Sequence, residues 1–569
     1  MSLSSALNIG STALAVNQAA IQTTGNNIAN VGNADYTRQT VSLTSAEDTK
    51  IGPGQFVGNG VLLTGIARQI DEALQGRLRS ASSDSESSST QQDWLSRVQS
   101  TFNELSDSDL STKLSTFYNA WSDLANKPQD TGLRQVVVQD GQAVTDWFHQ
   151  INNSLGSLRT DLTTQITGLA GQADNLAGQI ADFNSKIVAA ESGGLSAQAN
   201  GLRDQRDAAI KQLSNLMDVK TVEQPNGVTN VYVGSEALVY DTRSNGVTTK
   251  TVTDGNGHQQ TNVVFKNNGG TLKITSGQLG ALGKVAQTLD DTGDQVDGLA
   301  SSLTYELNKV HSSGQGLKGQ SSIVGTTTVT DPAAALSSTK SGLKQTPSNG
   351  SFVVHVKNTK TGLETSTLVK VDIEGKPTDT SLNSLIAQLD GIDGVTAVNN
   401  GGRLQISADD APATELTFSQ DSSGTLAALG VNTFFTGTNA KDIDLNKTIV
   451  NDPDLVAASQ NGDSADNGTA KAIANLETTA VKSLGGSTME DSYQSLINGL
   501  ASKAATATSD ATASKAVVDT LSNQREAISG VSMDEEAVNL MKYQRAYQGA
   551  ARLITVVNDM MTTLMGMAT

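Results

Sequence analysis

Two Asp-Thr-Gly triplets, Asp130–Gly132 and Asp291–Gly293, are the residues of this sequence whose types and pairing could support catalysis. In aspartic proteases the two aspartates share a proton across a cleft, and each follows an apolar strand. Here Asp130 follows Lys-Pro-Gln and precedes a helical pattern, a position that suits a helix N-cap. Asp291 lies inside a helical pattern. Neither triplet has the strand that this chemistry needs, so the sequence argues against a protease.

Metal chemistry is not indicated either. The histidines fall in unrelated segments and do not form a His-Glu-x-x-His motif or a comparable spacing. The acidic stretch Asp290–Gly298 lacks the ligand spacing and the closing glutamate of a calcium loop, and we predict that it is a solvated helix face. The sequence therefore predicts no catalytic residue, no metal, no cofactor and no enzymatic activity. The four histidines are His149, His258, His311 and His355.

Composition narrows the class of protein further. The chain has 569 residues, a formal net charge of −19 and no cysteine. Acidic residues outnumber basic ones, 58 to 39, so the chain has few cations free to displace the counterions of a nucleic acid. This argues against nucleic acid as a partner. No stretch of the sequence reaches 18 consecutive apolar residues, so no membrane span is predicted. The first residues lack the basic and apolar regions of a secretory signal peptide, so an exported chain would need another route.

The two ends of the chain carry apolar residues at every seventh position, which is the pattern of a coiled-coil seam. A helix with one apolar stripe and no core is marginal alone, so each terminal helix needs a partner. We therefore expect the two helices to be mobile in the monomer, and to pair with each other and with other copies on assembly. The predicted interface residues are Leu7, Leu14, Ile21 and Ile28, then Leu540, Tyr543, Tyr547, Ala550, Ile554, Val557, Met561 and Leu564.

Between the ends, the pattern alternates between helices and Gly-rich strands. Residues 155–187 fill eight consecutive seam positions, and Gly193-Gly194 is the predicted end of that helix. The serine-rich residues 80–90 are interpreted as a solvated helical turn or a short break. From Val219 onward, strand-like segments are separated by residues typical of hairpin turns. Residues 320–435 show a predicted β-β-α-β order.

The predicted fold class is a multidomain, elongated α+β protein, with its termini paired as a coiled coil, a long helical bundle and β-rich outer domains. The predicted parts are 1–70, the N-terminal axial helix and a β-like region; 71–220, a helical bundle; 221–277, a β-rich domain; 278–320, a return helix; 321–435, an inserted α+β outer domain; 436–530, a returning helical segment; and 531–569, the C-terminal axial helix.

The residues at both ends also resemble a known family. Asn26-Asn-Ile-Ala-Asn-Val31 followed by Tyr36-Thr-Arg-Gln39 is similar to the N-terminal motif of the bacterial flagellar axial proteins of rod, hook and junction. Asn33-Ala-Asp35 stands where that family commonly has Thr-Pro-Gly. Ser529–Leu540 and Tyr543–Gln548 are similar to the family's closing helix. The matching motif residues are Asn26, Asn27, Ile28, Ala29, Asn30, Tyr36 and Arg38.

Internal segments resemble the junction members of this family. They are Leu202-Arg-Asp-Gln-Arg-Asp207, Leu307–Gly314, Phe434–Gly437 and Asn451–Pro453. Another axial protein, such as the hook protein or the second junction protein, is the main alternative. A secreted adhesin is a more remote one, because it would not need matched terminal seams.

The resemblance implies a structural adaptor that joins hook to filament as a ring of identical subunits. It implies extracellular placement at that junction, after export through the flagellar type III apparatus without a cleaved signal. It also implies contacts with the hook protein and a second hook-associated junction protein. Before export, a cytoplasmic chaperone would bind the C-terminal helix.

Overall fold

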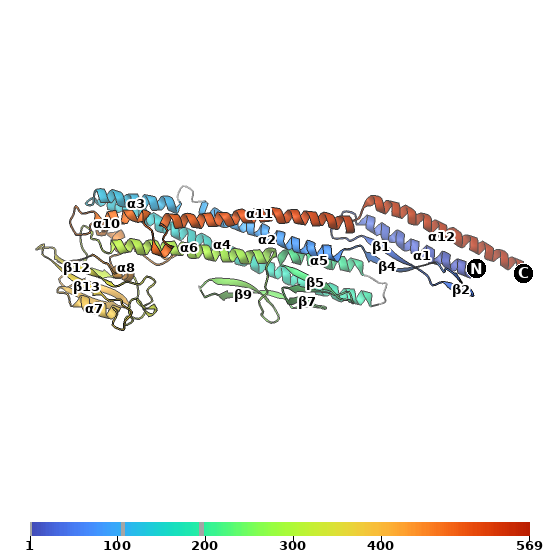
Figure 1. Cartoon of the computed structure of the whole chain (residues 1–569), viewed down its shortest axis with the longest axis horizontal. Helices are drawn as coiled ribbons and strands as arrows, with labels where there is room; N and C mark the ends of the chain where they lie inside the picture. Colours follow the sequence, from blue (N-terminus) through green and yellow to red (C-terminus); the bar gives the residue numbers. More distant parts are fainter. Residues whose placement is uncertain (1–2, 104–108, 193–198, 256, 569) are drawn as a thin grey trace. The chain divides into compact units, whose positions relative to one another are not determined.

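The computed structural model describes residues 3–103, 109–192, 199–255 and 257–568. The predicted helix end at Gly193-Gly194 lies outside them. Contacts divide the chain into two units, the first formed by Met1–Trp94, Asp161–Ala286 and Ala505–Thr569, and the second by Leu95–Thr160 and Gln287–Ala504. Helices and strands are mixed, as predicted, and the chain ends in a long helix (Figure 1). None of the described helices is long and apolar enough to cross a membrane.

In the first unit the two terminal helices lie side by side (Figure 1). They are α1 (Leu3–Ala29) and α12 (Met533–Ala568), and each is one uninterrupted helix. A Cβ placed on Gly10 would lie 2.8 Å from Cγ1 of Ile554, which is too close for any side chain without a shift. Gly10 therefore allows the two helices to approach each other closely at this point.

A pair of antiparallel ribbons follows α1. Strand β1 (Gln39–Ser45) pairs with β4 (Val61–Arg68), and β2 (Thr49–Gly52) pairs with β3 (Gln55–Val57). Both β1 and β4 contact α1. Tyr36 precedes β1, and its side chain takes part in the polar contacts described below.

Long helices carry the core of the first unit. In α4 (Thr131–Glu191) the predicted seam residues Ile166, Ala173, Ile180 and Ile187 are buried. Helix α2 (Glu72–Asn103) continues through the serine-rich residues, so of the two predicted alternatives the helical turn is correct and the short break is not. Ser83 and Ser87 are buried, so the predicted solvation is wrong at these two positions. Helix α5 (Asn200–Leu216) follows α4.

Two antiparallel sheets complete the first unit. One has the order β5-β6-β7-β8, made of Val219–Glu223, Thr229–Val233, Glu236–Tyr240 and Arg243–Ser244. The other pairs β9 (Val247–Thr253) with β10 (Gln259–Phe265). The predicted turn at Asn226-Gly227 connects β5 to β6, and Gly227 has a φ of +81°, a conformation that favours glycine.

The second unit is built around helices and an aromatic cluster. It contains α3 (Leu110–Asn126), the start of α4, and parts of α6 (Gly277–His311) and α11 (Met489–Ser529). Asp130 Oδ1 accepts hydrogen bonds from the backbone N–H groups of Gly132 and Leu133, which confirms it as the N-cap of α4. The rings of Phe117, Trp121, Phe434 and Phe435 pack together with centroids 4.9–6.3 Å apart.

One prediction about this unit's acidic residues is wrong. Asp290 was expected on a solvated helix face, but it is 5% exposed and forms an ion pair with Arg159. Asp291, the aspartate of the second Asp-Thr-Gly triplet, lies inside α6 and not in a loop after a strand. The pattern of acids alone could not show that a cation from another helix faces one of them.

His311 gives the second unit a pH-dependent stability. Its Nε2 accepts from the backbone N–H of Ala457 (3.0 Å), and its Nδ1 lies 2.9 Å from the carbonyl oxygen of Asn432. Burial lowers the pKa of His311 to about 4. The unfolded chain therefore binds more protons between pH 4 and about 6.5, so the free energy of unfolding falls as the pH drops through this window.

We expect this histidine to remove about 2 kcal/mol of stability between pH 7 and pH 5. Urea unfolding at both pH values should show that loss in the natural chain and a loss smaller by that amount in His311→Gln. The control is His149→Gln, at a partly exposed position of α4. An equal pH dependence in the natural chain and His311→Gln would contradict the prediction.

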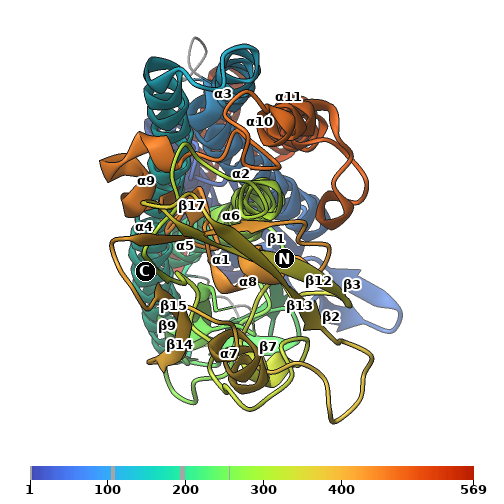
Figure 2. The same cartoon turned by 90° about the vertical axis from the view of Figure 1, so that its left-hand side faces the viewer.

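The insert of the second unit contains two three-stranded sheets and a helix (Figure 2). The sheet β13-β12-β16 consists of Glu364–Val371, Gly350–Asn358 and Thr414–Ser419; the sheet β11-β15-β14 consists of Ser322–Val324, Arg403–Ala408 and Val395–Asn400. Helix α7 (Leu382–Asp390) packs on β14. The insert therefore has both strands and a helix, as predicted. Strands β11, β14 and β16 were not predicted from the sequence.

Short elements connect the insert to α11. They are α8 (Thr425–Leu429), β17 (Phe435–Thr436), β18 (Asp444–Leu445), α9 (Lys447–Asn451) and α10 (Gly468–Ala474). Helix α10 packs on α3. The division into seven parts, the elongated shape and the coiled-coil geometry of the termini stay predictions.

Candidate functional site

A buried polar cluster, which we call the terminal clasp, holds the two ends of the chain together. It consists of Asn27, Tyr36, Arg38, Glu535 and Glu536. Asn27 is 1% exposed, and its Nδ2 donates to the carbonyl oxygen of Gln39 (2.9 Å) and to Glu536 Oε2 (3.0 Å). Its Oδ1 accepts from the Tyr36 hydroxyl (2.8 Å) and from the backbone N–H of Gln39 (3.0 Å). Both donors and both lone pairs of this amide are therefore used.

The charged half of the clasp joins Arg38 to the first turn of α12. Arg38 Nη2 lies 2.7 Å from Glu536 Oε1, and its Nη1 lies 2.8 Å from Glu535 Oε2. The Glu536 side chain is only 2% exposed, whereas that of Glu535 is 62% exposed. A carboxylate in the first helical turn is also stabilised by the helix dipole. The buried pair therefore joins the segment around Arg38 to the first turn of α12.

The clasp also reaches α11 and α5. Arg38 donates its backbone N–H to the carbonyl oxygen of Ser529 (3.0 Å), and Arg525 Nη2 donates to that of Tyr36 (3.3 Å). The backbone N–H of Thr37 donates to Asp204 Oδ2 (3.4 Å). Burial and the nearby carboxylates of Asp204 and Glu536 raise the pKa of Tyr36 to about 12, so its hydroxyl stays a donor at neutral pH.

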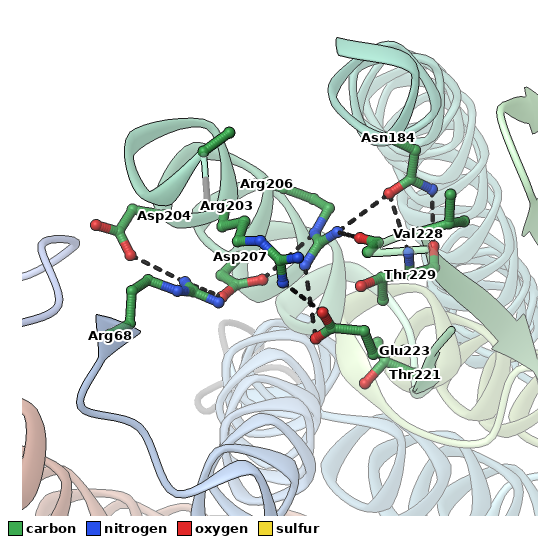
Figure 3. Close-up of polar contacts among 12 residues, drawn as sticks. Arg68, Asn184, Arg203, Asp204, Arg206, Asp207, Thr221, Glu223, Val228 and Thr229 are labelled. Atoms are coloured by element: carbon green, nitrogen blue, oxygen red, sulfur yellow. Dashed lines mark hydrogen bonds and ion pairs between the residues drawn. The ribbon is translucent and has the colours of Figure 1, made fainter. Parts of the chain in front are cut away.

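Beside the clasp lies an arginine network made by Arg68, Arg203, Asp204, Arg206 and Asp207 (Figure 3). Arg68 Nη1 bridges Asp204 Oδ1 (2.9 Å) and Asp207 Oδ2 (2.7 Å). Burial lowers the pKa of Arg68, but the two carboxylates outweigh it and the net shift is upward. This contact joins β4 to α5.

Arg203 and Arg206 join the same helix to other elements (Figure 3). Arg203 Nη2 pairs with Glu191 Oε2 (2.8 Å), and its Nη1 pairs with Glu223 of β5. Arg206 is 1% exposed and donates from Nη1 to the carbonyl oxygen of Gly227 (2.6 Å). Burial lowers the pKa of Arg206. The segment Leu202–Asp207 thus fastens the end of α4, α5 and the β5–β6 turn.

The predicted interface residues are divided between two environments. On α12, Leu540, Tyr543, Tyr547, Ile554 and Met561 are partly buried and Ala550 and Val557 are buried, all on one face, whereas Leu564 is 57% exposed. On α1 the predicted row is only half-buried. The buried positions of α1 lie outside that row and, apart from Val16, are small or polar residues, namely Gly10, Ala20, Thr23, Thr24 and Asn27.

The family motif residues also have different surroundings. Asn27, Tyr36 and Arg38 form the clasp. Ile28 and Asn30 are partly buried, and Asn26 and Ala29 are exposed. Glu536 had no role in the sequence interpretation, although the acidic run Asp534-Glu535-Glu536 at a predicted helix start was a signal for a partner cation.

The charged side chains of this region are paired, and the described residues contain no group of three or more His, Asp or Glu that could hold a metal ion. What the clasp and the network do is to position α1, α12, α5 and the ribbons against one another.

Two parts of the chain match models of flagellar protein families. Residues 95–324 match the model of the flagellar hook-associated protein FlgK helical domain, and residues 523–567 match that of the flagellar basal body rod FlgEFG protein C-terminal region. The chain is 25% identical to flagellar hook-associated protein 1 of Escherichia coli (strain K12) over 99% of both chains. It is 26% identical to the Salmonella typhimurium protein of that name, over 99% of this chain and 100% of the other.

A solved structure, that of the flagellar hook junction protein FlgK from Burkholderia pseudomallei, aligns with 80% of this chain and 100% of its own. The TM-score is 0.49 and the identity 16%, a level that adds nothing to the assignment. The assignment depends on the two family models, which lie in the order expected along the chain, and on the full-length relatives. The chain is therefore similar over nearly its full length to flagellar hook-associated proteins, and its residues 95–324 match the model of their FlgK helical domain.

Proposed function

We propose that this chain is the structural adaptor that joins the hook to the filament of the bacterial flagellum, as a ring of identical subunits. The proposal is supported by the similarity over 99% of the chain to proteins named flagellar hook-associated protein 1. In this role the hook protein lies on one side of the ring and a second hook-associated protein on the other. The chain acts outside the cell.

The observation that carries an assembly role is the apolar face of α12 that α1 leaves uncovered. Val538 and Val556 on this face are 61% and 48% exposed. Met541 and Met560 extend it and are 53% and 54% exposed. Exposed apolar patches of this kind indicate surfaces that other proteins cover. Neighbouring subunits are the occupants that the proposed ring supplies.

The predicted seam residues have a second part in this proposal. Tyr547, Ile554 and Val557 hold α12 against α1, so that the helix pair docks as one unit and presents its outer face. Leu564 lies one heptad after Val557 on the same stripe, but it is 57% exposed and so stays open to a partner. Coiled-coil packing between subunits then uses both helices.

Export is the other half of the proposed function. The chain leaves the cell through the flagellar type III apparatus, and a cytoplasmic chaperone covers the C-terminal helix beforehand. The exposed methionines and valines of α12 are the surface that such a chaperone would bind, since they are apolar and accessible in the free chain.

The test is the double variant Val556→Asp/Met560→Asp in cells that lack the natural protein. Two buried charges are expected to abolish incorporation at the junction, and hence filaments, because an unpaired charge inside an interface is costly. The secreted monomer should keep the circular dichroism of the natural chain. Electron microscopy of isolated flagella and swimming motility give the readout.

Two further variants complete this experiment. Asn558→Asp adds a charge at an exposed polar position of α12 and should assemble normally. Ile554→Asp is expected to separate α1 from α12 already in the monomer, because Ile554 lies against Gly10 of the same chain. Normal filaments from the double variant would rule out the outer face of α12 as the interface.

A further inference from the structure

We propose that a polar cavity beside the terminal clasp receives the guanidinium group of an arginine from a second copy of this chain. The cavity has a volume of about 680 Å³. Its walls come from the end of α1, the loop before β1 and one side of α5. Its lining includes Asn26, Asn30, Asp35, Asn200, Asp204 and Gln205.

The lining of this cavity is rich in hydrogen-bond acceptors. Two of its residues, Asp35 and Asp204, carry carboxylates, and none is a lysine or an arginine. Asp204 is 8% exposed, and it shares its cation, Arg68, with Asp207. Burial raises the pKa of Asp204, with Arg68 opposing the shift. Asp35 lies 3.6 Å from Lys211 Nζ, but both of these side chains are more than half exposed, so this pair is weak. Because Arg68 is shared by two carboxylates, the negative charge in this wall is only partly compensated.

Asn200 provides an independent observation. It is 7% exposed, and its Nδ2 donates to the carbonyl oxygen of Ile66 (2.8 Å), but its Oδ1 has no hydrogen-bond partner. Buried acceptors are nearly always paired in folded proteins. Asn200 begins α5, and Glu191 Oε1 accepts from the adjacent backbone N–H of Ala199 (2.9 Å), so the positive end of this helix already faces a carboxylate.

These features select the chemical class of the ligand. An anion would be repelled by Asp35 and Asp204. A metal ion would need more charged ligands, and the described residues offer no group of three. A guanidinium carries one positive charge and five N–H donors in one plane, which suits several carboxylate and amide oxygens that come from different elements.

A second copy of this chain can supply such a group, and this step depends on the proposed function. Arg545 and Arg552 lie one heptad apart on α12, both are exposed, and neither is in an ion pair among the described residues. They lie between Val538 and Val556, on the helix face that α1 does not cover. An arginine from this face would enter the cavity of the neighbouring subunit.

The first experiment probes the cavity in the purified full-length monomer with N-acetyl-arginine amide, by saturation-transfer difference NMR. The uncharged isostere N-acetyl-citrulline amide should give no transfer. Gln205→Lys places a cation in the cavity and should weaken arginine-amide binding at least about tenfold. Gln212→Lys, on the same helix outside the cavity, should bind as the natural chain does.

Equal transfer to both probes, or unchanged binding by Gln205→Lys, would overturn the cavity as a guanidinium site. This experiment does not depend on assembly, so its failure leaves the adaptor role standing. Conversely, normal filaments from Val556→Asp/Met560→Asp would refute the proposed interface without affecting arginine-amide binding.

The second experiment tests the source of the arginine. The chain has no cysteine, so two engineered thiols can be placed without background. Gln205→Cys and Arg545→Cys, or Gln205→Cys and Arg552→Cys, are expressed in separate copies, and isolated flagella are oxidised. A disulfide-linked dimer of this chain supports the proposal. Filaments that assemble normally without any such dimer would overturn the second copy as the source.

Discussion

Replacing Glu536 by alanine is expected to destabilise the packing of α1 on α12 by about 3–5 kcal/mol. The reason is the burial of the groups that lose their partner. Glu536 and Asn27 are 2% and 1% exposed, and the Arg38 side chain is 17% exposed. Without this carboxylate, the mostly buried Arg38 keeps only the exposed carboxylate of Glu535, and the Asn27 amide loses one of its two acceptors. Both terminal helices should then open without unfolding the second unit.

Hydrogen–deuterium exchange of the monomer measures this opening. Peptides from α1 and α12 should exchange about a hundredfold faster or more in Glu536→Ala, since each 1.4 kcal/mol is a factor of ten. Glu535→Ala removes the other carboxylate bound to Arg38, but that side chain is 62% exposed, so its loss should cost less than about 1 kcal/mol. If the two variants exchanged alike, the buried clasp would not hold the helices.

The second large effect is expected for Arg206→Met. Arg206 is 1% exposed, and its removal leaves the carbonyl oxygen of Gly227 without its donor. Asp207 and Glu223, 3.6 Å and 3.9 Å from this guanidinium, would lose a compensating charge. Breaking such a buried network by removing one member typically costs about 3–5 kcal/mol.

Urea unfolding of the full chain, with exchange measured in β5 and β6, tests this prediction. The control is Lys186→Met, which removes an ion pair with Asp182 in which both side chains are more than half exposed. That variant should change the free energy of unfolding by less than about 1 kcal/mol. A loss in Arg206→Met no larger than in the control would mean that methionine packs there as well as the charged network does.

The helices were the part of the fold that could be predicted from the sequence. Seven-residue spacing of large apolar side chains is a local signal, and Ile166, Ala173, Ile180 and Ile187 are buried where it placed them. At the N-terminus the same spacing did not identify the most buried positions of α1. There the closest contact is made by Gly10 and the most buried positions include Thr23 and Asn27, because two helices that approach closely need small residues between them.

The clasp could not be predicted from spacing. Asn27 and Glu536 are 509 positions apart, and no local pattern shows that one hydrogen bond joins them. The resemblance singled out Asn27 and Arg38 as motif residues, but it did not identify the carboxylate that they share. The arginine network was likewise quoted as a segment, Leu202–Asp207, without the partners that Arg68 and Gly227 provide.

The remaining wrong predictions concern short strands and small polar residues. Strand β16 (Thr414–Ser419) is recognisable only through its pairing with β12, since six residues give little periodicity. Ser83 and Ser87 looked like solvated turn residues, yet they are 2% and 3% exposed inside α2. A serine that faces a neighbouring helix allows close packing, which composition alone does not reveal.

The sequence distance across the clasp has a consequence for the order in which the molecule is completed. A chain is synthesised from its first residue onward, so Asn27 is made long before Glu536. Until the C-terminal segment has been made, the Asn27 amide and Arg38 lack this carboxylate. Stable pairing of the two ends is therefore possible only for a full-length copy. Burial of the Glu536 carboxylate therefore requires both ends of the polypeptide. A prematurely terminated copy can fold its middle, but it cannot pair α1 with α12.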